Sequence, residues 1–83
     1  MRLDEYITSH FDELWHFLHR QLYPSFHDDT EDFIQEGLIK ALNVSDRYTF
    51  LTERRIKKFI LVTCRNAAIE FIRKTSNLSL IHI

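Results

Sequence analysis

The sequence predicts an all-α protein, a small bundle of three main helices. The chain has 83 residues, of which 45% are apolar, but it contains only one glycine and one proline. This composition favours long helices over disorder or a turn-rich β fold. Apolar residues also recur at three- and four-residue intervals, the spacing of one face of an α-helix. A domain of this size buries roughly 60 to 65% of its unfolded surface, so we expect modest stability.

The first helix is predicted from an apolar stripe near the start of the chain. Its members are Leu3, Tyr6, Ile7, Phe11, Leu14, Trp15, Leu18 and Leu22. Pro24 is expected to close this helix, because proline cannot donate a backbone hydrogen bond within it. A turn is therefore predicted from Pro24 to Asp29.

The second helix is predicted to start after a cap at Asp29 or Thr30. Glu31 and Asp32 follow in its first turn, where the helix dipole favours negative charge. The expected buried residues are Phe33, Ile34, Gly37, Leu38, Ala41 and Leu42. Glycine costs roughly 1 kcal/mol relative to alanine inside a helix. Gly37 therefore indicates close approach of another backbone.

The third helix is predicted to run from a cap at Thr52 to about Thr75, after an irregular connector over residues 43–51. A helical wheel places one side against the core: Ile56, Phe59, Ile60, Thr63, Cys64, Ala67 and Phe71. The opposite side is cationic, with apolar residues among its charges: Arg54, Arg55, Lys58, Leu61, Val62, Arg65, Ile69, Ile72 and Arg73. We expect a base, a partner helix or the tail to cover these apolar residues. Residues 1–75 are predicted to form the domain and residues 76–83 a short C-terminal tail.

The charges are divided between the two parts of the chain. Residues 1–36 carry nine Asp or Glu and two Lys or Arg, whereas residues 37–83 carry three and nine. The near-neutral total therefore conceals a net charge of −7 in the first part and +6 in the second. The basic part is a candidate footprint for a nucleic-acid backbone. Simple solvation of charged helix faces is the open alternative.

No catalytic, metal-binding or cofactor-binding residue is predicted, and we expect the protein not to be an enzyme. Cys64 is the single cysteine and falls on the packed side of its helix. His16 and His19 have the spacing to clasp a metal, but the pattern fixes no third ligand. One glycine cannot build a phosphate-binding loop. With no 18-residue apolar run and no signal-peptide pattern, we expect a soluble, cytoplasmic protein.

Two motifs, in this order and spacing, resemble region 2 of bacterial sigma-70-type initiation factors. They are Asp32-Phe-Ile-Gln-Glu36 and Arg65-Asn66-Ala-Ala-Ile-Glu-Phe-Ile-Arg73. The resemblance covers about residues 3–75. It implies a transcription initiation subunit that binds the β′ clamp of RNA polymerase core and the minus 10 element of promoter DNA.

The resemblance implies a polymerase-binding row on the second predicted helix. The row comprises Asp32, Gln35, Glu36, Leu38, Ile39 and Leu42. Its acidic and amide groups can pair with arginine on the partner, while Leu38 and Leu42 would supply apolar anchors. The alternative is that Gln35 and Glu36 are ordinary exposed helix residues.

The resemblance also implies a DNA-binding surface on the third helix and the loop before it. This surface comprises Tyr48, Phe50, Arg54, Arg55, Lys58, Arg65 and Asn66. The cations would bind phosphates, and Tyr48 or Phe50 would stack on an unpaired base, a contact worth roughly 1 to 3 kcal/mol. The Asn66 amide can hydrogen-bond to the edge of a base and so distinguish one base from another. Burial of Tyr48 and Phe50 beneath the loop is an equally open alternative.

The sequence departs from the family in two ways. Val62 and Thr63 stand near the positions where primary sigma factors carry adjacent tryptophans, so strong autonomous DNA melting is not expected. The 83 residues also contain no region 4, the helix-turn-helix that reads the minus 35 element. The main hypothesis is a region-2-only co-sigma subunit of a two-subunit (split) sigma factor, acting with a separate sigma subunit that carries region 4. The alternatives are a region-2 mimic that regulates a sigma factor or polymerase without binding DNA, and a fragment of a longer sigma factor.

Overall fold

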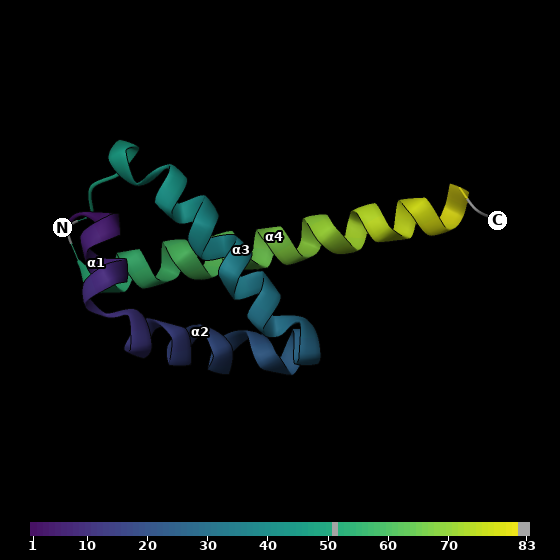
Figure 1. The fold of residues 1–83 in the computed structure, drawn as a ribbon, viewed down its shortest axis with the longest axis horizontal. Helices are drawn as coiled ribbons and strands as arrows, with labels where there is room; N and C mark the ends of the chain where they lie inside the picture. Colours follow the sequence, from purple (N-terminus) through teal and green to yellow (C-terminus); the bar gives the residue numbers. More distant parts are fainter. Residues whose placement is uncertain (51, 82–83) are drawn as a thin grey trace.

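The computed structural model describes residues 1–50 and 52–81, with side chains described as far as Thr75. This part of the chain forms four α-helices and two 3₁₀ turns (Figure 1). The elements are α1 (Leu3–Ser9), α2 (Phe11–Phe26), η1 (His27–Asp29), α3 (Thr30–Asn43), η2 (Ser45–Arg47) and α4 (Glu53–Ile81). The described residues contain no strand, only an isolated bridge between Arg2 and Thr49. The all-α prediction is confirmed.

Helix α4 determines the shape of the molecule, which measures 48 × 26 × 16 Å. Figure 1 shows α3 crossing α4, with α1 and α2 packed around the first part of α4. The C-terminal turns of α4 extend beyond the other helices. The bundle core therefore lies against the N-terminal half of α4.

The predicted first helix is two helices, α1 and α2, that meet at His10. Just before the break, the Thr8 hydroxyl donates to the carbonyls of Asp4 at 3.0 Å and Glu5 at 3.1 Å. Such side-chain bonds to the preceding turn weaken and bend helices. The bend lets both halves of the stripe face one core, and its fully buried members are Leu3, Tyr6, Ile7, Leu14, Leu18 and Leu22.

The predicted turn from Pro24 to Asp29 is wrong in its first half, because α2 continues through Pro24 to Phe26, and right in its second, where η1 covers His27–Asp29. Proline removes its own N–H but leaves the following residues free to stay helical for part of a turn. The residue that follows the helix, His27, has a φ of 48°, in the left-handed region. The 3₁₀ turn η1 then leads directly into α3.

Helix α3 begins at Thr30, as predicted, but without the predicted cap. Neither Asp29 nor Thr30 makes a capping bond within the described residues, and the Thr30 hydroxyl is buried without a hydrogen-bond partner there. The predicted buried residues Phe33, Ile34, Gly37, Leu38 and Ala41 are buried. The prediction for Leu42 is wrong, since its side chain lies beside the buried arc and is 41% exposed.

Helix α4 has the predicted start but not the predicted end. The Thr52 hydroxyl accepts the Arg55 N–H at 3.3 Å, which confirms the cap. The helix does not end near Thr75, because its backbone stays helical to Ile81. The side chains of the predicted tail, its last two residues and Leu51 of the connector lie outside the described residues.

The packed side of α4 agrees with the wheel in its first half only. Ile56, Ile60, Cys64 and Ala67 are buried, and Phe59 and Thr63 are half-buried. Phe71 was predicted to be packed but is 57% exposed. Its ring keeps one contact with α3, edge to face on Phe33 at 5.7 Å, and most of the side chain is left to solvent.

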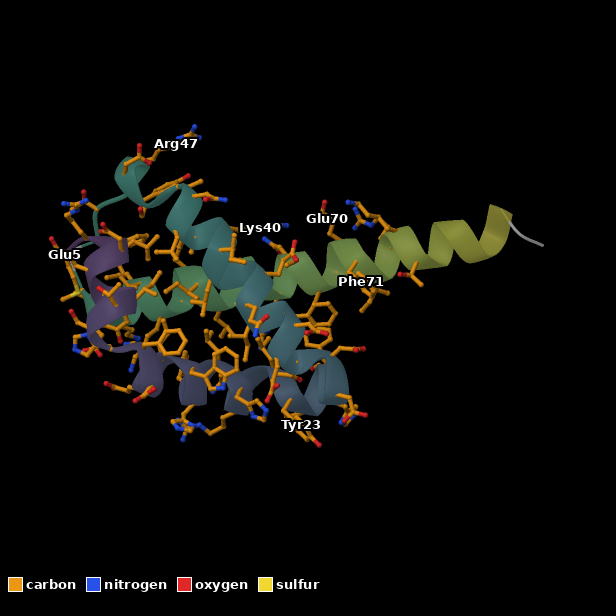
Figure 2. The ribbon with its side chains drawn as sticks, in the orientation of Figure 1. Glu5, Tyr23, Lys40, Arg47, Glu70 and Phe71 are labelled. Carbon is orange, nitrogen blue, oxygen red and sulfur yellow. The ribbon has the colours of Figure 1, made fainter. Side chains whose placement is uncertain are left out.

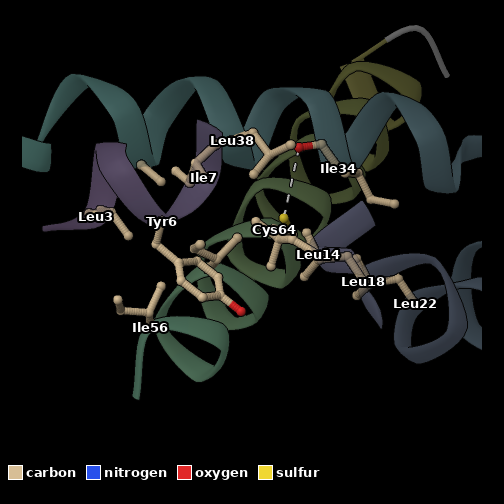
Figure 3. Close-up of a cluster of buried hydrophobic side chains, with 12 residues drawn as sticks. Leu3, Tyr6, Ile7, Leu14, Leu18, Leu22, Ile34, Leu38, Ile56 and Cys64 are labelled. Carbon is tan, nitrogen blue, oxygen red and sulfur yellow. Dashed lines mark hydrogen bonds between the residues drawn. The ribbon is translucent and has the colours of Figure 1, made fainter. Parts of the chain in front are cut away.

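The core is centred where α3 crosses α4, at Gly37 and Cys64. A Cβ added to Gly37 would lie 2.8 Å from the Cα of Cys64 and would also overlap its sulfur. The Cys64 thiol in turn lies 3.9 Å from the carbonyl of Ile34 in the previous turn of α3 (Figure 3). The close approach expected from Gly37 is confirmed, and only glycine permits it without a backbone shift.

We expect Gly37→Ala to lower the free energy of unfolding by about 1 to 2 kcal/mol. Overpacking costs about 1 to 3 kcal/mol, and we expect a value near the top of this range because the added Cβ would clash with backbone. It outweighs the roughly 1 kcal/mol that alanine gains in helix propensity. Urea denaturation would measure the change, with the exposed Gln35→Ala as control. A Gly37→Ala protein at least as stable as the wild type would contradict the close crossing.

Candidate functional site

The outer side of α3 presents most of the polymerase-binding row implied by the sequence. Asp32, Gln35 and Glu36 are exposed, together with Ile39 at 59% and Leu42 at 41%. Leu38 does not belong to this surface, because it is 7% exposed and packs in the core. The apolar anchors available to a partner are therefore Ile39 and Leu42.

A chain of ion pairs joins this side of α3 to α4. Lys40 Nζ lies 3.2 Å from a Glu70 carboxylate oxygen and 4.0 Å from one of Glu36. Lys74 Nζ approaches the other Glu70 oxygen at 3.4 Å. Figure 2 shows Lys40 and Glu70 pointing toward each other. The Lys40 hydrogen bond, followed by its charge and by Lys74, holds the pKa of Glu70 below its usual range.

The implied DNA-binding side chains of α4 all lie on the outside of the helix. Arg54, Arg55, Lys58, Arg65 and Asn66 are exposed. Among the described side chains, the four cations of this set make no ion pair. Their charge is therefore available to an external anion.

Lys57 differs sharply from its neighbour Lys58. Its ammonium lies 3.4 Å from Glu13, 3.7 Å from Glu53 and 5.5 Å from the centre of the Phe17 ring. Only 24% of its side chain is exposed. The two adjacent lysines thus have different roles, since Lys57 joins α4 to α2 and Lys58 points to solvent.

Three aromatic rings lie together where the connector meets α4. The Phe59 ring centre is 5.2 Å from that of Tyr48 and 5.2 Å from that of Phe50. Phe50 packs against the core, whereas Tyr48 is 45% exposed. Of the two candidates, Tyr48 is therefore the one with a ring accessible to a base.

A buried tyrosine fixes the start of α4 against α1. The Tyr6 hydroxyl donates to the Glu53 carboxylate at 2.8 Å. This hydrogen bond is the main cause of a lowered pKa at Glu53, and Lys57 contributes to it. The pKa of Tyr6 is raised, first by burial and then by the Glu53 bond. The sequence analysis missed this contact because 47 residues separate the two side chains.

Of the residues considered for chemistry, Cys64 and His19 are engaged in packing, whereas His16 is exposed. Burial raises the pKa of the Cys64 thiol to about 12, so it is neutral at physiological pH. His19 stacks on Tyr23 with ring centres 5.3 Å apart. The described residues contain no group of three or more His, Cys, Asp or Glu placed to hold a metal ion.

Comparison with known protein families identifies the fold. The model for Sigma-70 region 2 matches residues 6–77, which span α1 to α4 and both surfaces described above. The chain belongs to the sigma-70 region 2 family. This family consists of non-enzymatic domains of transcription initiation factors, and its members generally bind RNA polymerase core and minus 10 DNA.

The other comparisons add no relative. No curated protein and no solved structure matches the chain. Within the described residues, no helix is both long and apolar enough to cross a membrane. The region 2 residues assigned to polymerase and DNA remain predictions, as does the separate region 4 subunit.

The Tyr6–Glu53 bond predicts how stability depends on pH. The pKa of Glu53 is lowered in the folded state. The contribution of the Tyr6–Glu53 hydrogen bond to folding stability is therefore complete above the ordinary pKa of 4.5 and is lost as the pH falls through the lowered pKa. The stability difference between wild type and Tyr6→Phe should therefore shrink in acid. Urea denaturation from neutral pH to about pH 3 would measure it.

The matched control is Tyr48→Phe, which removes a hydroxyl that makes no hydrogen bond within the described residues. Its stability difference from wild type should not vary with pH. If the stability difference between Tyr6→Phe and wild type were also independent of pH, the hydrogen bond would not favour the ionised form of Glu53.

Proposed function

We propose that this sigma region 2 domain binds RNA polymerase core through α3 and minus 10 promoter DNA through α4. The supporting observation is that two exposed rows of opposite chemistry lie on two helices whose crossing is fixed. The acidic and amide row faces outward from α3, and cations that make no ion pair among the described side chains face outward from α4. The domain contributes binding and strand capture, not catalysis.

The polymerase contact is assigned to Asp32, Gln35 and Glu36, with Ile39 and Leu42 as apolar anchors. A row that combines carboxylates, an amide and large exposed aliphatic side chains suits an arginine-bearing helical partner. The β′ clamp helices are the partner implied by the family. Leu38 contributes indirectly, by holding α3 against α4.

The DNA contact is assigned to Arg54, Arg55, Lys58 and Arg65 for phosphates and to Tyr48 for base stacking. Cations without internal partners bind a polyanion without breaking existing pairs, and binding releases counterions. Asn66 is exposed next to Arg65 and offers an amide for base recognition. Phe50 supports Tyr48 and does not itself stack on a base.

We further propose that region 4 is supplied by a separate sigma subunit, as in two-subunit sigma factors. Val62 is 44% exposed near the position of the melting tryptophans. Its small aliphatic side chain suits a subunit that captures an opened strand with help from a partner.

In vitro transcription with core polymerase would test the whole proposal. We expect transcripts from this chain together with the region 4 subunit, and none from either alone. Glu36→Lys should reduce transcription at least about tenfold, because it reverses a charge at the centre of the polymerase row. The control is Glu5→Lys, the same change at an exposed carboxylate on α1, which should leave transcription intact. Inhibition of another sigma factor, without any transcripts, would instead indicate a protein-binding regulator.

Binding to single-stranded minus 10 DNA would test the cationic row separately. Lys58→Ala should reduce the slope of log affinity against log salt by about 0.7, the value for one lost phosphate contact. Lys57→Ala should leave that slope nearly unchanged, since Lys57 is already paired with Glu13 and Glu53. Salt-independent binding, or equal effects from the two lysines, would contradict the assignment.

A further inference from the structure

A groove of about 460 Å³ lies between the first half of α3 and the end of the described side chains of α4. Its apolar lining comes from Phe33, Ala67 and Phe71. Phe71 is the exposed member, whereas Phe33 is 7% exposed and Ala67 5%. The proposed polymerase row shares Asp32 and Glu36 with this groove, but Phe71 lies outside that row.

Phe71 is held in place by a short series of rings. Its ring meets that of Phe33 edge to face at 5.7 Å, and Phe33 meets Phe26 in the same way at 5.3 Å. These contacts join α4 through α3 to the end of α2. The exposed face of Phe71 is therefore a preorganised apolar surface, which costs little entropy to use in binding.

The charges around the groove favour a cation. Its carboxylates are Asp29, Asp32, Glu36 and Glu70, and its cations are Lys40 and Lys74, so the lining carries a net charge of −2. Both lysines are already directed at Glu70. Among the described side chains, Asp29 and Asp32 make no ion pair.

We propose that this groove receives an arginine side chain from the polymerase helix that docks on α3. The guanidinium would lie against the face of Phe71 and pair with Asp29 and Asp32. Arginine suits the groove better than lysine, because its flat, weakly hydrated head both stacks on aromatic rings and binds carboxylates. The inference rests on the proposed function and extends the interface from α3 onto α4.

Equilibrium binding of purified core polymerase to the labelled chain would test the groove. We expect Phe71→Ala to weaken binding about 5- to 30-fold, the usual effect of losing an aromatic anchor. Ile72→Ala is the matched control, since Ile72 is the next residue, is 49% exposed and does not line the groove. Its effect should be less than about twofold.

A second pair of variants avoids any disturbance of the ring contacts. Asp29→Asn removes a groove carboxylate that makes no capping bond, and should weaken binding about threefold or more. Asp28→Asn is its control, because Asp28 is an exposed neighbour outside the groove.

Two further changes are made at position 71 itself. Phe71→Tyr should bind like the wild type, since the ring face is kept. A benzophenone side chain at position 71 should crosslink to the β′ subunit.

The results separate failure of the groove from failure of the proposed function. If Glu36→Lys abolishes polymerase binding while Phe71→Ala and Asp29→Asn bind normally, the polymerase contact stands and the groove proposal is overturned. If Glu36→Lys also binds normally, both proposals fail. If Phe71→Ala does not fold, Asp29→Asn and the crosslink decide the outcome.

Discussion

The close crossing of α3 and α4 at Gly37 and Cys64 is the constraint on which the rest of the molecule depends. Only a glycine lets the α3 backbone come this near the Cα of Cys64. This contact directs Ile34, Leu38 and Ala41 inward, so Asp32, Gln35 and Glu36 must face outward. It also brings Lys40 next to Glu70 and Phe33 next to Phe71, and all four residues line one groove.

A second constraint sets the start of α4. Glu53 and Lys57 turn toward α1 and α2, where they meet Tyr6, Glu13 and Phe17. These inward contacts use one side of the helix and leave the outward cations without an ion pair among the described side chains. The division is physical, since a lysine held by two carboxylates gives little net attraction for DNA, whereas a solvated cation attracts phosphate at long range.

The fold places the acidic and basic parts of the sequence on different surfaces. Asp29, Asp32 and Glu36 lie in the groove or the proposed polymerase row. The cations on another exposed side are Arg54, Arg55, Lys58 and Arg65. The modest stability expected for a domain of this size suits the proposed role. Partners that bind only the folded state stabilise it further by mass action.

The sequence alone determined the helical class, the two motifs, the starts of α3 and α4, and the need for close packing at Gly37, because periodicity, the acidic first turn of α3, the Thr52 cap and glycine act locally. Only the tertiary structure decided which side chains a partner can reach. Leu38 and Leu42 look equivalent in the sequence, but their different angles around α3 bury one and expose the other. Phe71 continues the apolar side of α4, but it is exposed because α3 covers only part of its ring. The Tyr6–Glu53 bond and the groove join residues far apart in the chain, and no local pattern specifies contacts at that separation.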